Sequence, residues 1–555
     1  MTARFVTLAL AIVFLAAFAL LAQLSRPVSP LAPIRFRNVA ASAGVDFVLE
    51  NNPTAEKHLI ETMPGGIAVF DYDGDGLPDI FFTNGARVPA LEKNAPKFHN
   101  RLFRNLGGMK FKDVTLEAGL AGVGYSIGAA AADYDNDGHV DLFVAGVRSN
   151  HLYRNLGKGK FADVTAKAGI SSAVWSITGG WFDYDNDGLL DLFVVNYVKW
   201  SPEIAPFCGD PVRKLRAYCH PRFFDGLANT LYHNRGDGTF EDVSEKSGIA
   251  SQIGKGMSVA FADYDGDGLT DVFVTNDKLP NFLFHNLGNG KFAEVALESG
   301  AALPDSGRNI SGMGVDFRDY DNDGLPDIVL TALAGETFPL FRNHGGGEFR
   351  DWTYHSRIGP LTNQCSGWGI GLYDFNNDGW KDLFTANAHV NDTVETFEAA
   401  KYMLANSIFA NAGDGTFRDV SNDAGANFAQ ARAHRGTAFA DFNNDGKIDV
   451  IVSALGEPAE LWQNASPDDN AWLILKLRGT RSNRDGIGAR VRIGNLYNQM
   501  TSSVGYASSS HFGVHFGLGR AKQVDRIEIR WPSGIEQVLS GVATNQVLQV
   551  TEPAK

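Results

Sequence analysis

Aspartates at a repeated spacing are the residues of this chain most suited to chemistry. The pattern DYDGDGLPD, which begins at Asp71, has aspartate at positions 1, 3, 5 and 9 and glycine at position 6. In a tight turn this spacing directs carboxylate oxygens, and the backbone carbonyl of position 7, into one small volume. Ca²⁺ accepts about six to eight such oxygens in flexible geometry, so the pattern favours Ca²⁺ over Mg²⁺.

The pattern occurs seven times, and successive copies begin 50 to 80 residues apart. An ordinary Asp-Gly turn explains one copy, but seven copies in register gather carboxylates that repel one another unless a cation lies between them. We therefore predict up to seven bound Ca²⁺ ions. The predicted ligands are Asp71, Asp73, Asp75 and Asp79; Asp133, Asp135, Asp137 and Asp141; Asp183, Asp185, Asp187 and Asp191; Asp263, Asp265, Asp267 and Asp271; Asp319, Asp321, Asp323 and Asp327; Asp374, Asn376, Asp378 and Asp382; and Asp441, Asn443, Asp445 and Asp449.

The EF-hand shares the opening spacing of this pattern but not its continuation. An EF-hand needs a bidentate glutamate at position 12 and flanking helices. Here the flanks of the first loop, Val69-Phe70 and Ile80–Phe82, are typical of β-strands. Position 12 is occupied by Phe82, Val144, Val194, Val274, Leu330, Thr385 and Val452. The sequence therefore predicts strand–loop–strand calcium sites.

The net charge of the chain agrees with this interpretation. It is −15, while hydrophobic residues make up 44% and charged residues 20% of a globular composition. The acidity is concentrated in the aspartate pattern, and it argues against a nucleic-acid partner because phosphate binding needs a basic surface. Seven Ca²⁺ ions would carry fourteen positive charges, which nearly balances the formal charge.

Two other patterns recur in step with the aspartates and indicate the strands that position them. A short apolar strand ends in asparagine, as in LFRN up to Asn105, and another strand begins with phenylalanine after a glycine turn, as in FKDV at Phe111. A strand of small residues precedes each loop and a β-rich strand follows it, for example Ile127–Ala132 and Val140–Val144. Each repeat thus supplies four strands.

Seven units of four strands favour an all-β fold, a seven-bladed β-propeller, over a solenoid. The strand that begins with phenylalanine follows six of the loops, and its seventh copy, Phe36-Arg-Asn-Val, lies near the N-terminus. This strand is expected to complete the blade that begins at Asp441, beside the strand that holds Trp462. The ring is then closed by the N-terminal strand and has no open sheet edge. The predicted propeller spans residues 35–466.

Residues 1–24 are predicted to be a signal peptide or an N-terminal membrane anchor. Arg4 precedes an uninterrupted apolar run from Phe5 to Ala22, which is long for a cleaved signal and short for a membrane span. Residues 25–34 form a proline-rich linker. The rest of the chain is then expected outside the cytoplasm, as a secreted, periplasmic or surface-anchored protein that meets the membrane only through such an anchor.

Cysteine usage agrees with export. Cys208 and Cys219 flank a short loop in the longest interval between aspartate patterns. A local disulfide is the expected state of such a pair in an exported protein. A metal site would need more ligands than the neighbouring His220 provides. Cys365 is left over and is expected to be a small buried residue.

A different β pattern begins at Ala471 and predicts a small β-rich C-terminal domain. Two of its stretches, Ala489–Ile493 and Arg526–Arg530, alternate in polarity as half-buried strands do. A ligand site is one interpretation of its polar residues, but a structural turn with a core tryptophan is favoured. The residues concerned are Arg484, Asp485, Arg490, His515 and Trp531.

Both parts of the chain resemble known families. The aspartate repeats resemble the FG-GAP/VCBS units of integrin α-subunit propellers, whose loops carry the same D-x-D-x-D-G-x-x-D pattern. The segments SNRDGIGARV at Ser482, HFGLG at His515 and RWPSG at Arg530 resemble the ASPIC/UnbV domain, which we place at residues 470–552. The cartilage acidic protein family has the same domain order. The resemblance implies extracellular calcium binding and interaction with a matrix or cell surface.

A non-catalytic binding or adhesion scaffold is the favoured function, with a protein or glycan ligand on a face of the propeller. Loops that connect the blades of a rigid ring form a broad recognition surface. A hydrolase or lyase that uses the central pocket is one alternative, and a structural component of a surface assembly is another. A cluster of histidine, arginine or glutamate at the ring axis would favour the enzyme.

No catalytic residues are predicted. The segment Gly124–Gly128 fits G-x-S-x-G, but it precedes an aspartate loop and does not join a strand to a helix, as a nucleophile elbow must. His389 lies in a longer connection between blades and could line an axial pocket, although a structural role is favoured for it.

Overall fold

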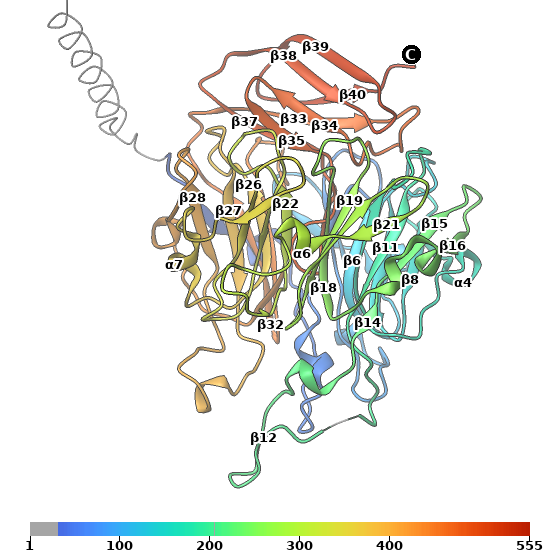
Figure 1. The fold of residues 1–555 in the computed structure, drawn as a ribbon, viewed down its shortest axis with the longest axis vertical. Helices are drawn as coiled ribbons and strands as arrows, with labels where there is room; N and C mark the ends of the chain where they lie inside the picture. The colour runs from blue at the N-terminus through green and yellow to red at the C-terminus, as the bar shows by residue number, and fades with distance from the viewer. Residues whose placement is uncertain (1–31, 205, 555) are drawn as a thin grey trace, which may run out of the picture. The chain divides into compact units, whose positions relative to one another are not determined.

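Seven antiparallel sheets, each of four strands from the repeats, follow one another along the described residues of the computed structural model (Figure 1). The structure describes residues 32–204 and 206–554. The predicted export segment 1–24 and most of the linker 25–34 therefore lie outside the described residues. The chain divides into two compact units, Met1–Ala32 and Pro33–Lys555, and the described residues fall almost entirely in the second.

Each sheet is one blade, and the blades are numbered in chain order with their strands given from the ring axis outwards. Blade 1 is β2 (Ile67–Phe70), β3 (Asp79–Phe82), β4 (Arg101–Asn105) and β5 (Phe111–Asp113). Blade 2 is β6 (Tyr125–Ala132), β7 (Asp141–Val147), β8 (His151–Asn155) and β9 (Phe161–Asp163). Blade 3 is β10 (Ser176–Phe182), β11 (Asp191–Asn196), β15 (Thr230–Asn234) and β16 (Phe240–Asp242). Blade 4 is β18 (Gly256–Ala262), β19 (Asp271–Asn276), β20 (Phe282–Asn286) and β21 (Phe292–Glu294).

The remaining three blades continue the ring. Blade 5 is β22 (Val315–Arg318), β23 (Asp327–Leu330), β24 (Leu340–Asn343) and β25 (Phe349–Asp351). Blade 6 is β26 (Gly367–Tyr373), β27 (Asp382–Asn387), β28 (Ser407–Asn411) and β29 (Phe417–Asp419). Blade 7 is β30 (His434–Ala440), β31 (Asp449–Ala454), β32 (Glu457–Asn464) and β1 (Phe36–Asn38).

Single-turn helices follow the outer strands of most blades. They are α2 (Ala40–Ala43), α3 (Thr115–Ala118), α4 (Thr165–Ala168), α5 (Ser244–Ser247), α6 (Ala296–Ser299) and α7 (Ile358–Thr362). The inner two strands of a blade are buried along their whole length, as in β6 and β7, whereas the outer strand β9 is partly exposed. Small residues in β6 suit the crowded axis, and the polar outer strand suits the rim.

An asparagine at the end of the third strand joins each blade to the preceding one. Asn155 Nδ2 donates to the carbonyl of Tyr72 in the loop of blade 1, at 2.8 Å. The same bond recurs around the ring, and the bond from Asn105 to Phe442 O, at 2.9 Å, links blade 1 back to blade 7. The other bonds are Asn234 to Tyr134, Asn286 to Tyr184, Asn343 to Tyr264, Asn411 to Tyr320 and Asn464 to Phe375. The recurring asparagine is therefore a ring-closing residue.

The N-terminal strand completes blade 7, as predicted. In the β1–β32 pair, Phe36 lies opposite Asn464 and Asn38 lies opposite Trp462. The Phe36 side chain is buried, and its ring stacks on Phe428 with 5.7 Å between centroids. The innermost strands also contact one another in cyclic order, including β30 with β2. The first and last repeats therefore meet.

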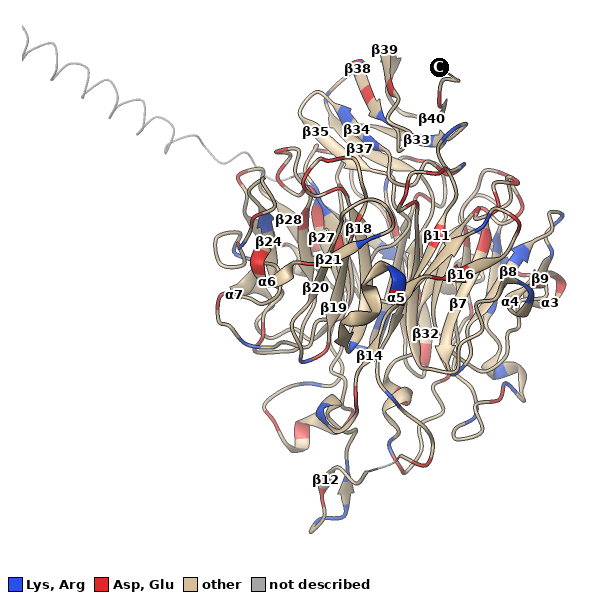
Figure 2. Ribbon diagram, turned by 45° about the vertical axis from the view of Figure 1, so that its right-hand side comes forward, with Lys and Arg blue, Asp and Glu red and all other residues tan. Residues whose placement is uncertain are grey.

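Residues 471–551 form a C-terminal domain of two sheets, in agreement with the predicted alternation. One sheet is β37 (Val514–Gly519), β33 (Ala471–Arg478) and β40 (Gln546–Thr551). The other is β35 (Leu496–Gln499), β34 (Arg490–Ile493), β38 (Gln523–Arg530) and β39 (Glu536–Ala543). Their apolar faces share a core with side chains of blades 2 and 3, such as Trp181. Figure 2 shows this domain at one end of the ring and the hairpin of β12 (Gly209–Asp210) at the other.

The axial segment, residues 501–511 of the C-terminal domain, enters the centre of the ring. Its strand β36 (Ser509–Ser510) pairs in parallel with β2, so it adds a fifth strand to blade 1. The segment also bonds to inner strands elsewhere in the ring: Gly505 N to Val315 O at 2.8 Å, Ala129 N to Ala507 O at 3.0 Å and Phe439 N to Ser510 Oγ at 2.9 Å. A Cβ on Gly66 would lie 2.3 Å from Ala507 O, so this close approach requires glycine. The axis is therefore filled from the side of the C-terminal domain.

Tyr506 is the largest buried side chain of the axial segment. Its hydroxyl donates to Met63 O at 2.8 Å, and its ring meets Trp368 edge-on with 4.8 Å between centroids. We expect Tyr506→Ala to lower the free energy of unfolding by about 3–5 kcal/mol, because it leaves a cavity at the axis. Tyr506→Phe, which removes only the hydrogen bond, should cost about 1 kcal/mol. Denaturant unfolding at fixed Ca²⁺ measures both, and equal values for the two variants would contradict the axial packing.

Candidate functional site

The seven aspartate loops join the first and second strands of the blades, and all lie at the end of the ring that the C-terminal domain covers. In the loop of blade 2, Asp133 Oδ1 accepts the Asp137 N–H at 3.0 Å and Oδ2 accepts the Gly138 N–H at 2.7 Å. Gly138 has φ +93°, a backbone conformation that L-residues rarely adopt. The carboxylate at position 1 thus shapes the turn that the glycine at position 6 permits.

The carboxylate at position 9 ties the loop to the third strand of its blade. Asp141 is fully buried, and its Oδ1 accepts the Asn155 N–H at 2.7 Å. Its Oδ2 accepts the Tyr134 N–H at 3.3 Å. Positions 1 and 9 therefore act structurally as well as offering oxygen atoms to the centre of the loop.

Carboxylate oxygens converge in these loops at the spacing that a metal ion needs. In the loops of blades 1, 2 and 3, oxygens of positions 1, 3 and 9 lie within 4.8 Å of one another. Several of the oxygens are buried without a hydrogen-bond partner, namely Oδ1 of Asp73, Asp135, Asp319 and Asp321. Because a buried carboxylate oxygen without a partner is costly, the described residues fit a bound cation. In the loops of blades 1, 2 and 3 the structure places the predicted residues at positions 1, 3 and 9 close together, and their role as calcium ligands stays a prediction.

Burial and mutual repulsion raise the pKa of these carboxyl groups in the absence of a cation. Burial, with the charge of Asp191 beside it, raises the pKa of Asp183 to about 8. Burial and the charge of Asp485 raise the pKa of Asp133 to about 7. Both values lie well above the ordinary aspartate pKa of about 3.9. A cation that binds these loops must therefore displace protons.

The raised pKa values predict an unusual pH dependence for the cation-free protein. Between about pH 4 and pH 8 the folded state holds protons on these carboxyl groups that the unfolded state has lost, so the free energy of unfolding falls as pH rises. In a chelator, Tm should drop by several degrees from pH 5.5 to pH 8. In millimolar Ca²⁺ the ligands are ionised and this drop should disappear. Thermal unfolding at several pH values tests this, and a chelated Tm that rises with pH would contradict it.

The sequence analysis did not identify a set of basic residues beside the loops. The residue that precedes the ring-closing asparagine pairs with the loop of its own blade, as Arg154 does with Asp135 at 2.6 Å and Asp137 at 3.0 Å. Arg104, His233, His285 and Arg342 occupy the same place in blades 1, 3, 4 and 5. In blades 6 and 7 the place holds Ala410 and Gln463, and those loops have Asn376 and Asn443 at position 3. The five loops with four aspartates therefore each have a basic residue at this place, and the two loops with three aspartates do not.

The C-terminal domain docks on the aspartate loops. Arg490 Nη1 lies 3.2 Å from Asp263 Oδ2, and Arg484 Nε lies 3.5 Å from Asp133 Oδ2. Asp485 Oδ2 accepts the Asp133 N–H at 2.8 Å. His515 Nε2 lies 3.2 Å from Gly446 O, and Trp531 is buried in the domain core. The buried Trp531 agrees with the structural role favoured from the sequence. The other four residues contact the propeller, which the sequence did not predict.

The opposite end of the ring has a cavity on its axis with a volume of about 330 Å³. Blades 3 to 6 supply most of its walls, through Tyr197, Asp277, Leu333 and His389 among others. His389 is buried at the cavity wall, so the axial placement considered for it from the sequence holds. His220, Lys278 and Glu336 also line the cavity, which thus contains the kind of cluster that distinguishes the enzyme alternative.

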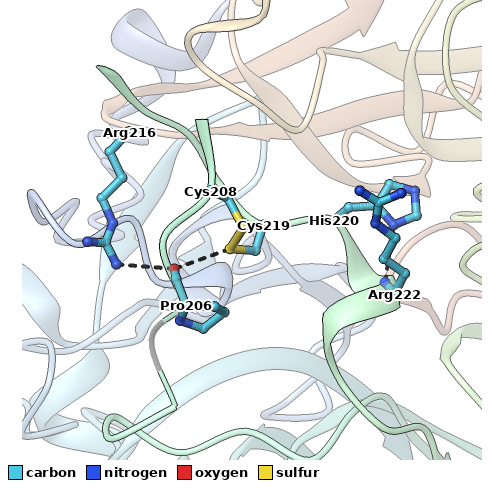
Figure 3. Close-up of a disulfide and its surroundings, with 6 residues drawn as sticks. All are labelled: Pro206, Cys208, Arg216, Cys219, His220 and Arg222. Atoms are coloured by element: carbon cyan, nitrogen blue, oxygen red, sulfur yellow. Dashed lines mark hydrogen bonds between the residues drawn. A yellow bond between two sulfur atoms is a disulfide. The ribbon is translucent and has the colours of Figure 1, made fainter. Parts of the chain in front are cut away.

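A disulfide fixes the insertion that reaches this cavity. Cys208 and Cys219 are bonded, with 5.3 Å between their Cα atoms, and close the hairpin of β12 and β13 (Leu215–Arg216). Figure 3 shows the Arg216 guanidinium donating to Pro206 O at 3.3 Å, with His220 following Cys219. Cys219 and His220 both line the cavity. Cys365 was expected to be buried, but it is partly exposed beside the core of blade 5.

Two further features of the chain bear on its function. Ser126 lies buried within the innermost strand β6, so the G-x-S-x-G segment has no strand-to-helix turn around it. Within residues 32–204 and 206–554, no helix has the length and apolar character needed to cross a lipid bilayer.

Comparison with known families identifies both parts of the chain. Residues 71–144, 133–194, 224–274, 263–330, 319–385 and 374–452 match the FG-GAP-like repeat family. Residues 479–555 match the ASPIC and UnbV family.

Several curated proteins and solved structures are similar to parts of the chain. Cartilage acidic protein 1 from Mus musculus is 27% identical over 336 residues, which cover 58% of this chain and 48% of that protein. Cartilage acidic protein 1 from Homo sapiens is 27% identical over 337 residues, covering 58% and 47%. The chain thus spans about half the length of the curated relatives it matches. The solved structure of YCF48 bound to a D1 peptide has a TM-score of 0.41 at 8% identity, and covers 78% of this chain and 98% of that chain. An Agrocybe aegerita protein that recognises terminal N-acetylglucosamine has a TM-score of 0.40 at 17% identity, covering 71% and 87%.

Proposed function

The chain belongs to the FG-GAP-like repeat family, with an ASPIC and UnbV domain at its C-terminal end, and on this premise we propose that it is an exported, calcium-loaded binding scaffold. In this proposal up to seven Ca²⁺ ions stabilise the ring. The scaffold binds a protein or glycan ligand on one face and does not transform it.

The convergence of buried carboxylate oxygens carries the calcium part of the proposal. In each loop the ligands would be the side chains at positions 1, 3, 5 and 9 and the backbone carbonyl of position 7. Oxygen atoms of Asp73 and Asp135 that are buried without a hydrogen-bond partner support this assignment. Asn376 and Asn443 offer neutral oxygens in blades 6 and 7, where the neighbouring basic residue is also absent.

The position of the C-terminal domain supports a ligand on the opposite face. Arg484 and Arg490 lie against the aspartate loops, so that end of the ring is occupied. The longer connections of the ring gather at the other end, where the disulfide-closed insertion and the axial cavity lie. Such connections are where rigid scaffolds usually present binding residues.

A hydrolase or lyase that uses the axial cavity is the second candidate. It is favoured by one observation, the presence of His220, His389, Asp277 and Glu336 together among the residues that line the cavity. A surface-assembly component is the third. Binding is preferred because Asp277 and Glu336 are already engaged, Asp277 by the Tyr197 hydroxyl and Glu336 by Lys278. Neither carboxylate is thereby marked as a proton donor or as a nucleophile.

Ligand capture under two calcium conditions tests the proposal. The chain without residues 1–24 is immobilised and exposed to extracellular glycans and proteins in millimolar Ca²⁺ or in a chelator. We expect saturable capture in Ca²⁺ only, with the eluted ligand unaltered in mass. Eluted ligand of lower mass would instead support the hydrolase or lyase, and equal capture in the chelator would contradict the role of calcium.

The disulfide gives an independent test of export. Cys208 and Cys219 should be found linked when peptides of the protein isolated from its native compartment are analysed by mass spectrometry without reduction. The partly exposed Cys365 should remain alkylatable and serves as the internal control. Finding both Cys208 and Cys219 alkylated without reductant would contradict export.

A further inference from the structure

The axial cavity contains a carboxylate that the repeat does not explain. Asp277 is the sixth residue after the last aspartate of its loop, and the same position in the other blades holds Gly85, Val147, Tyr197, Leu333, Ala388 and Leu455. Asp277 is therefore the one acidic residue at this repeat position. It is buried, with 8% of its surface exposed, and lies outside every aspartate loop. A buried carboxylate without a role in the repeat points to a ligand.

Local contacts hold Asp277 at the cavity wall. Its Oδ2 accepts the Tyr197 hydroxyl at 2.6 Å, and its backbone N–H donates to Lys255 O at 2.9 Å. Lys278, the next residue, has φ +58°, which is uncommon for a residue other than glycine. Arg148 and Gly456, which occupy the same repeat position in blades 2 and 7, also have positive φ, so this turn is a feature of the repeat that fixes the backbone beside Asp277. The carboxylate is thus pre-organised.

Two imidazoles line the cavity, and each carries one N–H donor. His389 Nδ1 accepts the Asn391 N–H at 3.0 Å, and His220 Nδ1 accepts the Arg222 N–H at 3.1 Å. Each bond assigns the tautomer in which Nε2 carries the proton. Burial lowers the pKa of both rings, so they remain uncharged at neutral pH. Two N–H donors and a carboxylate acceptor suit hydroxyl groups, which both donate and accept.

Much of the remaining wall is apolar and adaptable. Met63, Met257, Met313 and Leu333 line the cavity together with Leu59. Unbranched methionine side chains adjust to irregular ligand surfaces. A ligand that matches both kinds of wall has an apolar face and a ring of hydroxyl groups, as a sugar does. A volume of about 330 Å³ lies in the range of small-ligand pockets.

The charges of the cavity select against acidic ligands. Asp277, Glu336 and Glu398 face a single ammonium group, that of Lys278, among the described residues that line it. Lys278 is already paired with Glu336, whose Oε2 also accepts the Ser311 N–H at 2.9 Å. Uronic or sulfated sugars would meet uncompensated negative charge, whereas a neutral sugar would not.

The cavity is closed at its inner end. Tyr506 of the axial segment contacts two lining residues, through its hydrogen bond to Met63 O at 2.8 Å and its ring contact with Trp368 at 4.8 Å. Because the segment enters from the side of the C-terminal domain, a chain cannot pass through the ring.

We propose that the axial cavity binds the terminal residue of a neutral glycan. This inference rests on the proposed binding function and names its ligand class and site.

Ligand-observed NMR on the calcium-loaded chain tests the inference. The probes are methyl glycosides of glucose, galactose, mannose, rhamnose and N-acetylglucosamine, with methyl glucuronide as the acidic comparison. We expect saturation transfer to at least one neutral glycoside and none to the glucuronide. Asp277→Asn, which keeps the size of the side chain, should weaken that binding at least about tenfold, because a hydrogen bond to a charged acceptor is lost. His389→Phe should weaken it as well.

Matched controls separate this inference from the calcium proposal. Asp225→Asn changes an exposed carboxylate of the insertion between β11 and β15, with 84% of its side chain accessible, and should leave sugar binding unchanged. All variants should keep the wild-type rise of Tm in Ca²⁺, which shows that they fold. No transfer to any neutral glycoside, or equal binding by wild type and Asp277→Asn, overturns the inference while the Tm response to Ca²⁺ is intact. Selective binding of the glucuronide would also overturn it.

Discussion

Adding millimolar Ca²⁺ to chelator-treated protein is expected to raise Tm by at least about 15 °C. Each loop that binds Ca²⁺ only in the folded state contributes about 2.7 kcal/mol when the free ion is about 100 times Kd. The seven loops lie in one ring whose blades are linked by asparagine bonds, so their contributions act on the same unfolding transition. We expect the ion-free protein to be unstable because oxygens of Asp73, Asp135 and Asp321 are buried without a hydrogen-bond partner.

The control for this result is Mg²⁺ at the same concentration. Mg²⁺ requires octahedral geometry with short bonds and gives up its bound water reluctantly. It should therefore restore only a small part of the stability. A Tm that is the same in chelator and in Ca²⁺ would contradict the metal assignment. A rise that Mg²⁺ reproduces in full would contradict the choice of ion.

Removing the N-terminal strand is expected to open the ring. Deletion of residues 1–40 removes β1 from blade 7 and leaves the backbone groups of β32 unpaired. It also removes the buried Phe36 ring, which stacks on Phe428 at 5.7 Å and meets Phe375 at 5.5 Å. Loss of a buried phenylalanine alone costs about 3–5 kcal/mol, so the truncated protein should be insoluble or unfold far more readily.

The matched control is deletion of residues 1–35, which retains the whole strand. This shorter deletion should stay soluble and monomeric and keep a Tm close to that of the longer protein. Size-exclusion chromatography and thermal unfolding in Ca²⁺ compare the two. If deletion of residues 1–40 also leaves a monomer with unchanged Tm, ring closure by β1 is wrong, and the assignment of seven blades must be revised with it.

The parts of the structure that could be predicted from the sequence are those that repeat. Seven copies of one loop, with strands in step, specify the blades, because a periodic pattern reports the same local structure many times. The displaced copy at Phe36 specified how the ring closes. Alternating polarity at Ala489–Ile493 and Arg526–Arg530 likewise predicted strands β34 (Arg490–Ile493) and β38 (Gln523–Arg530) of the C-terminal domain.

Features that occur once could not be predicted in this way. The axial segment has small polar residues with no periodicity, and its burial depends on inner strands that are far away in sequence, such as β2 and β6. Arg484 and Arg490 gave no sign that their partners are Asp133 and Asp263.

Asp277 could have been found, because aligning the repeats shows an aspartate where the other blades have uncharged residues. The basic residues at Arg154 and its equivalents could have been found by the same alignment.

The number of calcium ions per chain is the most direct test of the account. Native mass spectrometry of the protein without residues 1–24, after exchange into volatile buffer with Ca²⁺, should give a mass that corresponds to seven bound ions. Treatment with chelator should remove them, and elemental analysis of the same sample confirms that the ion is calcium. A chain with the same mass before and after chelation, or with a single ion at saturating Ca²⁺, would contradict the assignment of the aspartate loops as calcium sites.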